Sequence, residues 1–321
     1  MALRKHPLFA PALGALFLSL ACGNSVPPLG TQPGSGSGSG GQVGGTIVIP
    51  TGGLVVVPTG GTAGGTRPGN GTPETCNGVD DDDNGIVDDL DKDKDGVCDC
   101  IRIATLGEVG TWGQGDVFGA WLTARASDGA KSLGKQVITD DLIKNFQVIV
   151  VQSVREGVIG RVYSDDEVKA LENWVRAGGG LMTLIGFYDP IEVQNVNRLL
   201  APYGMNYGNK RMLPRVGNVT VPITEFSAHP ITASVKSVGV DNGYEPQGAG
   251  TVYAKGGGYQ VGLAQTVDKG RVDLWGDEWI TYNSEWTQHP DYQVELFWVN
   301  TIKWLTPTNV CQVAIPIALI P

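Results

Sequence analysis

The stretch from Cys76 to Cys100, CNGVDDDDNGIVDDLDKDKDGVCDC, constrains the folding of this chain more than any other. It contains ten Asp and no Glu, with a cysteine at each end. So many carboxylates repel one another and cannot join an apolar core, so the stretch must be either solvated or neutralised by a cation. It therefore separates a preceding segment from a following one, and the two are interpreted independently.

The spacing of the acidic residues predicts a calcium loop. With Asp80 at position 1 of a twelve-residue loop, Gly85 falls at position 6, where such loops require a glycine for a sharp turn. Calcium prefers six to eight oxygen ligands, and alternate residues of a tight loop can supply them. The predicted ligands are Asp80, Asp82, Asn84, the Ile86 carbonyl, Asp88 and Asp91.

A second register of the same kind overlaps the first. It would use Asp91, Asp93, Asp95, the Val97 carbonyl and Asp99. Its twelfth position is Arg102 and not an acid, so this register is incomplete. The prediction is one or two Ca²⁺ ions, with Asp91 shared if there are two. The alternative is a solvated acidic linker, which is what most charge runs are.

The sequence Cys-Asn-Gly-Val-Asp-Asp-Asp at 76–82 resembles a short acidic motif of secreted bacterial surface proteins. It also resembles, more loosely, the calcium repeats of thrombospondin type 3. Some proteins with the first motif are described as copper-binding. The stretch contains no His or Met, and its cysteines are better explained as disulfides, so calcium is the expected ion.

Residues 1–22 are expected to be an export signal. Arg4 and Lys5 precede an apolar run that ends shortly before Ala21 and Cys22, a pattern typical of secretory signals. It resembles a bacterial lipoprotein signal, although Ser19 stands where that family usually has Leu. The resemblance implies that Cys22 carries lipid such as palmitate, and that Gly23 directs the protein to the outer membrane, with cell-surface exposure as one outcome. The alternative is ordinary cleavage and secretion.

Residues 23–75 are rich in Gly, Ser, Pro and Thr, and are expected to be a disordered tether. After export, the cysteines beyond Cys22 are Cys76, Cys98, Cys100 and Cys311. An even number in an oxidising compartment predicts two disulfides, with three connectivities available. Cys98 and Cys100 are too close in sequence to bond each other easily, so Cys311 is expected to join one of them and Cys76 the other.

Strand and helix patterns alternate in residues 101–321, which predicts an α/β domain with a mainly parallel sheet covered by helices. Val148–Gln152 is a predicted buried strand. Ser164–Glu167 is a capping box that opens a helix, Gly178–Gly180 ends that helix, and Leu181–Ile185 is the next strand. The stretch from Tyr207 to Lys269 is Gly-rich and is expected to be irregular, with a few short strands.

This order of elements, with GRVDLWGD at 270–277, resembles the class I glutamine amidotransferase-like superfamily, a flavodoxin-like fold with three layers. Active relatives carry a nucleophilic Cys in a tight elbow after the strand at 181–185. The elbow here reads Ile185-Gly186-Phe187-Tyr188-Asp189 and has no Cys, Ser or Thr. The resemblance therefore implies a non-catalytic domain, because covalent catalysis needs a nucleophile.

Open sheets of this kind bind ligands beyond the carboxyl ends of their strands. The residues expected to converge there are Glu108, Trp112, Gln152, Arg155, Tyr188, Asp189, Asp277, Glu278 and Trp279. Aromatic side chains beside carboxylates suit a sugar or a peptide-like ligand. The competing interpretation is that the tryptophans pack in the core or at its rim and the acids cap loops.

These features favour a lipid-anchored surface protein that binds calcium and, through its α/β domain, a glycan or an envelope protein. One alternative is a secreted hydrolase that cleaves carbohydrate with Asp189, Asp277 or Glu278, and another is a purely structural envelope module. The formal charge is −10; the ten Asp and two Lys of residues 76–100 give −8, which leaves −2 for the rest. No basic surface for nucleic acid is indicated.

Overall fold

The computed structural model describes residues 69–76, 80–84, 86, 88–92, 94, 98–110, 114–155, 161–186, 190–215 and 220–306. The predicted signal with Cys22 and most of the predicted tether lie outside these ranges. Of the predicted site residues, Asp93, Asp95, Val97, Trp112, Tyr188, Asp189 and Cys311 also lie outside them.

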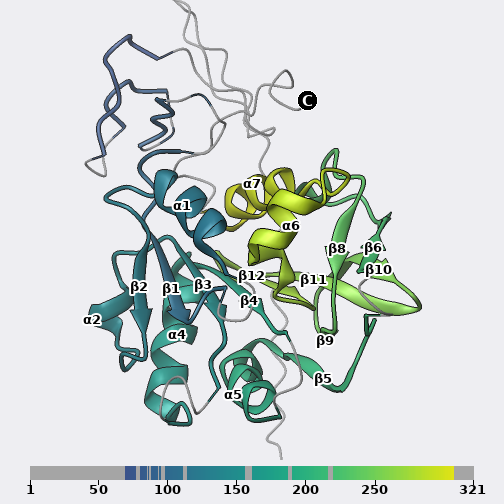
Figure 1. The fold of residues 1–321 in the computed structure, drawn as a ribbon. Coiled ribbons are helices and arrows are strands. Elements are labelled where there is room, and N and C mark those ends of the chain that lie inside the picture. Colours follow the sequence, from purple (N-terminus) through teal and green to yellow (C-terminus); the bar gives the residue numbers. More distant parts are fainter. Residues whose placement is uncertain are drawn as a thin grey trace, which may run out of the picture. The chain divides into compact units, whose positions relative to one another are not determined.

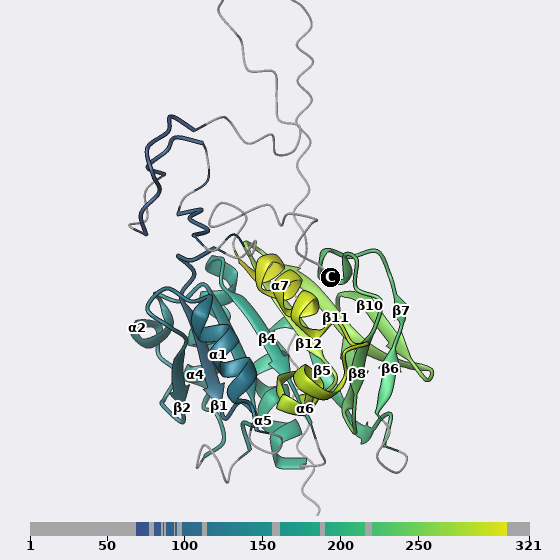
Figure 2. The same cartoon turned by 45° about the horizontal axis from the view of Figure 1, so that its top comes forward.

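Eight strands form the central sheet, in the order β2-β1-β3-β4-β12-β11-β10-β7 (Figures 1 and 2). The five strands at one end run parallel: β2 (Lys131–Gly134), β1 (Ile103–Gly107), β3 (Val148–Gln152), β4 (Gly180–Leu184) and β12 (Gly270–Trp275). The other three pair antiparallel: β11 (Tyr259–Val267), β10 (Thr251–Gly256) and β7 (Glu225–Phe226). The predicted three-layer, mainly parallel α/β fold is confirmed.

Helices cover both faces of the sheet (Figure 1). One face packs against α1 (Asp116–Ala124), α6 (Asn283–Gln288) and α7 (Val294–Leu305). The other packs against α2 (Asp140–Ile143), α4 (Asp165–Ala177) and α5 (Pro190–Leu200). Strand β3 shows why both faces need a cover. Val148 and Val150 pack in the core beside α1, α6 and α7, and Ile149 and Val151 pack in the core beside α2, α4 and α5. A strand buried on both faces is therefore apolar along nearly its whole length.

Helix α4 begins and ends where its sequence predicts. The Ser164 side chain accepts a hydrogen bond from the Glu167 backbone N–H, and the Glu167 side chain accepts one from the Ser164 backbone N–H. This reciprocal capping box satisfies two N–H groups that the first turn leaves unpaired. Gly178, with φ at 133°, ends the helix in a conformation that other residues rarely adopt. The predicted capping box is confirmed.

The stretch from Tyr207 to Lys269 contains short strands, as expected, but it is more regular than its Gly-rich composition suggests. Besides β7, β10 and β11, this part of the chain contains two small antiparallel pairs: β5 (Met205–Arg211) with β9 (Tyr244–Gly248), and β6 (Val221–Ile223) with β8 (Val238–Val240). These short strands pair with partners distant in sequence, as Met205 does with Gly248. Local composition therefore could not reveal how they pair.

No helix in the described part of the chain is long and apolar enough to cross a membrane.

A buried carboxylate in β12 makes stability depend on pH. Asp273 is fully buried, and its Oδ1 accepts a 2.9 Å hydrogen bond from the Tyr253 hydroxyl. Burial raises the pKa of Asp273 from 3.8 to about 7, despite that hydrogen bond. Between about pH 4 and 7, Asp273 is therefore protonated in the folded state and ionised in the unfolded state. In this window the contribution of Asp273 to stability falls as pH rises.

We expect Asp273→Asn to remove this contribution, because an amide keeps the acceptor for Tyr253 without a charge. Urea unfolding at pH 4.5 and 7.5 should find the variant close to wild type at the lower pH. At the higher pH it should be more stable, by on the order of a few kcal/mol. Asp141→Asn is the control, because Lys144 lowers the pKa of the fully exposed Asp141 out of this window. A difference from wild type that does not change with pH would contradict the prediction.

Candidate functional site

The parallel strands bring several loops together at one edge of the sheet. β2 and β3 both flank β1, so the chain continues on one side of β1 and then on the other. In open α/β sheets the crevice beyond such a switch point is where ligands bind. The carboxyl ends of β3, β4 and β12 lie beside it, because these strands are neighbours in the sheet. The chemistry of this edge therefore depends on the residues that follow those strands.

A buried glutamate is the centre of this edge. Glu278, which follows β12, is 3% exposed. Its Oε2 accepts a 3.0 Å hydrogen bond from Gln152 Nε2 and lies 3.5 Å from the Ser153 hydroxyl, while its Oε1 accepts a hydrogen bond from the Tyr282 hydroxyl. We call Gln152, Ser153, Glu278 and Tyr282 the strand-end cluster. It joins the loop after β3 to the loop after β12.

Burial and hydrogen bonding act in opposite directions on Glu278. Burial raises its pKa, whereas the Tyr282 and Gln152 hydrogen bonds and the charge of Arg155 lower it, and the net shift is upward. The pKa of Tyr282 is raised by its own burial and by the Glu278 charge. Tyr282 therefore remains a protonated donor at neutral pH. A carboxyl group with a raised pKa is suited either to accept ligand hydrogen bonds or to exchange a proton.

The elbow after β4 is occupied by the same glutamate. A Cβ atom at Gly186 would lie 2.1 Å from Glu278 Oε1 and 2.2 Å from Glu278 Cγ. Glu278 therefore lies against the backbone at the position expected for the elbow. Within the described residues, the group next to this elbow is a carboxylate. Phe187, Tyr188 and Asp189 lie outside those residues.

The structure brings some of the predicted site residues together and separates others. Gln152 and Glu278 are in direct contact, and Arg155 is close enough for its charge to act on Glu278. Glu108 is exposed, and its backbone N–H donates to the Gln152 carbonyl at 3.0 Å. Gln152 Oε1 is buried without a hydrogen-bond partner among the described residues. That lone acceptor leaves the strand-end cluster able to accept one more hydrogen bond.

Asp277 and Trp279 match the competing interpretation of the sequence, in which the acids cap loops and the tryptophans pack in the core. Asp277 accepts hydrogen bonds from the backbone N–H groups of Asp241, at 2.7 Å, and Glu278, at 2.8 Å. The Trp279 indole donates to the Ser284 hydroxyl at 2.7 Å, and its ring is 4% exposed. Asp277 thus organises a loop and Trp279 packs in the core. Sequence reasoning missed Ser153 and Tyr282, although Ser153 directly follows Gln152.

The acidic stretch contains a second candidate site. Carboxylate oxygens of Glu74, Asp80 and Asp82 lie within 4.8 Å of one another. Asn84 fixes the two aspartates, because its backbone N–H donates to Asp80 Oδ1 at 3.1 Å and to Asp82 Oδ1 at 2.9 Å. Glu74 is held by the backbone N–H groups of Asp82, at 2.7 Å, and Asp88, at 3.1 Å. These three residues form the acidic cluster.

The acidic cluster agrees with only part of the predicted loop. It includes Asp80 and Asp82, and Asn84 supports it through its backbone. The Asn84 side-chain oxygen accepts the Ile86 N–H at 2.8 Å, and Asp99 accepts the Lys92 N–H at 2.6 Å. Glu74 lies in the segment 23–75, which the composition predicts to be a tether, so the sequence does not identify it as a ligand. Burial, and then the charges of Asp89 and Asp82, raise the pKa of Glu74.

A disulfide closes the acidic stretch. Cys76 and Cys100 are bonded with an S–S distance of 2.08 Å. Cys98 and Cys100 are buried in the core on the α1 and α7 face of the sheet. This pairing is one of those that the sequence leaves open, and in the same connectivity Cys98 would pair with Cys311. Cys311 lies outside the described residues.

The fold and the strand-end cluster define a three-layer α/β protein whose candidate site lies at the carboxyl ends of parallel strands. No protein-family model and no curated protein matches the chain. Among solved structures, a cytoplasmic protein from Salmonella typhimurium LT2 is 13% identical, with a TM-score of 0.51 over 64% of this chain and 100% of its own. This likeness supports the fold alone.

Two further structures are similar at lower scores. A ThuA-like protein from Bacteroides uniformis is 12% identical, with a TM-score of 0.41 over 63% of this chain and 90% of its own. An exo-β-1,4-mannosidase from an Opitutaceae bacterium is also 12% identical, with a TM-score of 0.38 over 64% of this chain and 36% of its own.

We expect Gly186→Ala to destabilise the domain by about 1–3 kcal/mol, because the new methyl group must displace a hydrogen-bonded glutamate. Urea unfolding of the variant would measure this. Gly119→Ala is a matched control, since a Cβ at Gly119 meets nothing within 4 Å and Ala favours the α1 helix. Combining Gly186→Ala with Glu278→Ala should cost less than the sum of the single variants. Additive costs would show that Glu278 does not constrain the elbow.

Proposed function

We propose that this chain is an exported surface protein in which a Ca²⁺-binding acidic stretch precedes an α/β domain that binds its ligand without covalent catalysis. The observation that carries the calcium proposal is the convergence of Glu74, Asp80 and Asp82. These residues are brought together by backbone hydrogen bonds that hold the carboxylates side by side. Carboxylates held together in this way repel one another unless a cation lies between them.

The donors of the acidic cluster fit a hard cation. All three are carboxylates, and carboxylate oxygens are ligands that Ca²⁺ prefers. The raised pKa of Glu74 reflects burial together with repulsion from Asp82 and Asp89, and a divalent ion would offset both effects. The bound ion would neutralise the cluster and order the stretch between Cys76 and Cys100. Asp88 and Asp91 would complete the site as further ligands, as the spacing predicts.

The ligand-binding proposal for the α/β domain depends on the strand-end cluster. Its elbow position is taken by Glu278, so the covalent chemistry of the amidotransferase-like superfamily has no nucleophile at Gly186. The buried Gln152 Oε1 and the Glu278 carboxylate are both acceptors. A ligand with hydroxyl or amide N–H donors, such as a glycan or an envelope protein, would complement them. The proposed location is the outer membrane, with Cys22 as the lipid anchor, or alternatively the secreted fraction.

We expect Ca²⁺ to stabilise the full chain against heat when disulfides are intact. If the dissociation constant is near 0.1 mM, 1 mM Ca²⁺ should stabilise the protein by roughly 1.4 kcal/mol relative to EDTA. Calorimetry should find saturable binding that Asp82→Asn abolishes. Glu74→Gln should weaken it at least tenfold, because a charged ligand is lost.

Asp291→Asn is the control, since it removes one exposed carboxylate outside the acidic stretch. Equal weakening by Asp291→Asn would show a general charge effect and no site. Binding that survives Asp82→Asn would also contradict the proposal.

A second candidate function is hydrolysis of carbohydrate, and Glu278 is the observation that favours it. A buried carboxyl group with a raised pKa can act as a general acid, as in many glycoside hydrolases. Tyr282 and Gln152 would then orient its two oxygens. Asp277 is engaged with two backbone N–H groups, which makes it a weaker candidate for proton transfer.

A screen of glycans for binding and for product formation separates the candidates. The binding proposal predicts saturable binding without product, weakened at least tenfold in Glu278→Gln, which keeps the shape of the side chain and removes its charge. Product formation that disappears in Glu278→Gln would establish the hydrolase instead. If no glycan or envelope component binds or raises the melting temperature, the purely structural module is the remaining function. Asp291→Asn serves again as the control for surface charge.

A further inference from the structure

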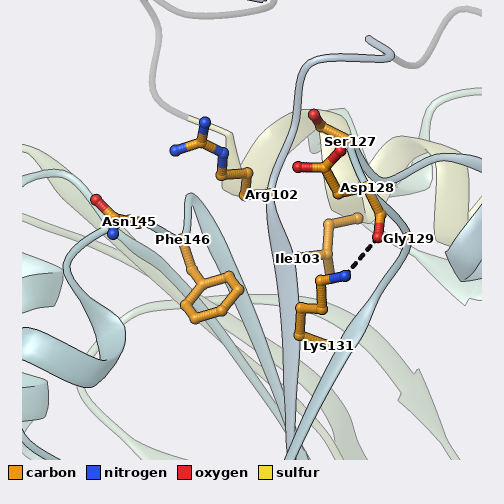
Figure 3. A pocket seen from close by; sticks show the side chains of 8 residues that line it. All are labelled: Arg102, Ile103, Ser127, Asp128, Gly129, Lys131, Asn145 and Phe146. Carbon is orange, nitrogen blue, oxygen red and sulfur yellow. Dashed lines mark hydrogen bonds between the residues drawn. The ribbon is translucent and has the colours of Figure 1, made fainter.

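Figure 3 shows a pocket at the amino-terminal ends of the parallel strands. The strand-end cluster lies at their carboxyl ends. The pocket is found where β1, β2 and β3 begin, and its volume is about 230 Å³. The residues that line it are Arg102, Ile103, Ser127, Asp128, Gly129, Lys131, Asn145 and Phe146. All of them lie in the described part of the chain. We call it the amino-edge pocket.

Hydrogen bonds fix the backbone on both sides of the pocket. The Arg102 carbonyl accepts the Gln147 N–H at 2.9 Å, and the Arg102 N–H donates to the Gln147 side chain at 2.7 Å. On the other wall, the Ser127 N–H donates to the Ile101 carbonyl at 2.7 Å. The Trp174 indole donates to the Phe146 carbonyl at 3.0 Å. The two walls are therefore positioned before any ligand arrives, which lowers the entropic cost of binding.

The loop that enters β2 forms the rim. Asp128 and Gly129 both have positive φ, at 61° and 75°, so the chain turns sharply there. The turn presents the Asp128 carbonyl to Lys131, whose Nζ donates to it at 2.6 Å, as Figure 3 shows. Lys131 is thereby fixed beside the pocket with donor capacity remaining, since an ammonium group has three N–H bonds.

The pocket combines unused donors with an apolar floor. Neither the Arg102 guanidinium nor the Asn145 amide makes a hydrogen bond or ion pair with another residue in the ranges that the structure describes. The half-buried Phe146 supplies the apolar surface (Figure 3), whereas the Ile103 side chain is buried in the core beside α1 and α7. Arg102 and Lys131 are cations and Asp128 is an anion, so the lining is positive overall in a chain of net charge −10.

We propose that the amino-edge pocket binds a small organic carboxylate that carries an apolar group. The guanidinium fork of Arg102 matches a carboxylate with two parallel hydrogen bonds, and Asn145 can donate a third. The apolar group of the ligand would lie on Phe146. The volume is below the range for drug-sized molecules, which limits the ligand to about the size of one ring with its carboxylate.

Benzoate and its neutral analogue benzamide test this proposal with the full chain. Calorimetric titration should find saturable benzoate binding and at least tenfold weaker benzamide binding, because only benzoate carries the charge. Arg102→Gln should weaken benzoate binding at least tenfold. Arg211→Gln removes an exposed arginine from β5 and should leave it unchanged. Asn145→Ala is a second test of the pocket at an exposed position. It should weaken benzoate binding by a smaller factor than Arg102→Gln does.

The proposal would be overturned by no benzoate binding, by equal binding of benzamide, or by unchanged binding in both Arg102→Gln and Asn145→Ala. Inorganic phosphate is titrated in parallel. Phosphate binding that matches or exceeds benzoate binding would show that the pocket selects charge alone and that its apolar floor contributes nothing, which contradicts the ligand class. Calcium and glycan binding involve other residues, so the proposed function and this inference can fail separately.

Discussion

The hydrogen bonds to Glu278 are the interaction on which the candidate site depends. A carboxylate removed from water is costly unless donors replace its solvation. Gln152 from the end of β3, with Tyr282 and Ser153, supplies those donors. The loops after β3 and β12 are therefore tied together through one side chain, and the elbow after β4 needs a glycine to make room for it. Loss of a single donor would leave a buried charge poorly solvated, so the three loops depend on one another.

Buried acids recur in this half of the domain and are satisfied in different ways. Asp273 has a tyrosine hydroxyl, Asp277 has two backbone N–H groups, and Glu285 has the Gly239 N–H at 2.9 Å. Burial raises the pKa of each. Their common effect is to favour the folded state at mildly acidic pH, because each releases its proton more readily when unfolded. Glu167 acts in the opposite direction, since hydrogen bonds and Arg161 lower its pKa despite burial.

The parallel half of the fold could be predicted because its signals are local. The capping box at Ser164, the glycine at Gly178 and the apolar run of β3 each depend on adjacent residues. The antiparallel half could be predicted only as a few short strands, because their pairing depends on distant partners. The site shows the same division. Gln152 and Glu278 could be predicted from strand ends, whereas Tyr282 contributes through a loop whose path the sequence does not reveal. Glu74 joins the acidic cluster from before Cys76, where composition resembles the tether.

The disulfide between Cys76 and Cys100 also has a mechanical consequence. The two cysteines are 24 residues apart in sequence but covalently joined, and Ile103, three residues after Cys100, begins β1. Tension applied to the chain before Cys76 would pass through the sulfur bridge directly into a strand in the interior of the sheet. The acidic stretch between the two cysteines would carry none of that load. Asp80 and Asp82 would keep their arrangement while the chain on either side is pulled, whereas Glu74, which precedes Cys76, would bear the load.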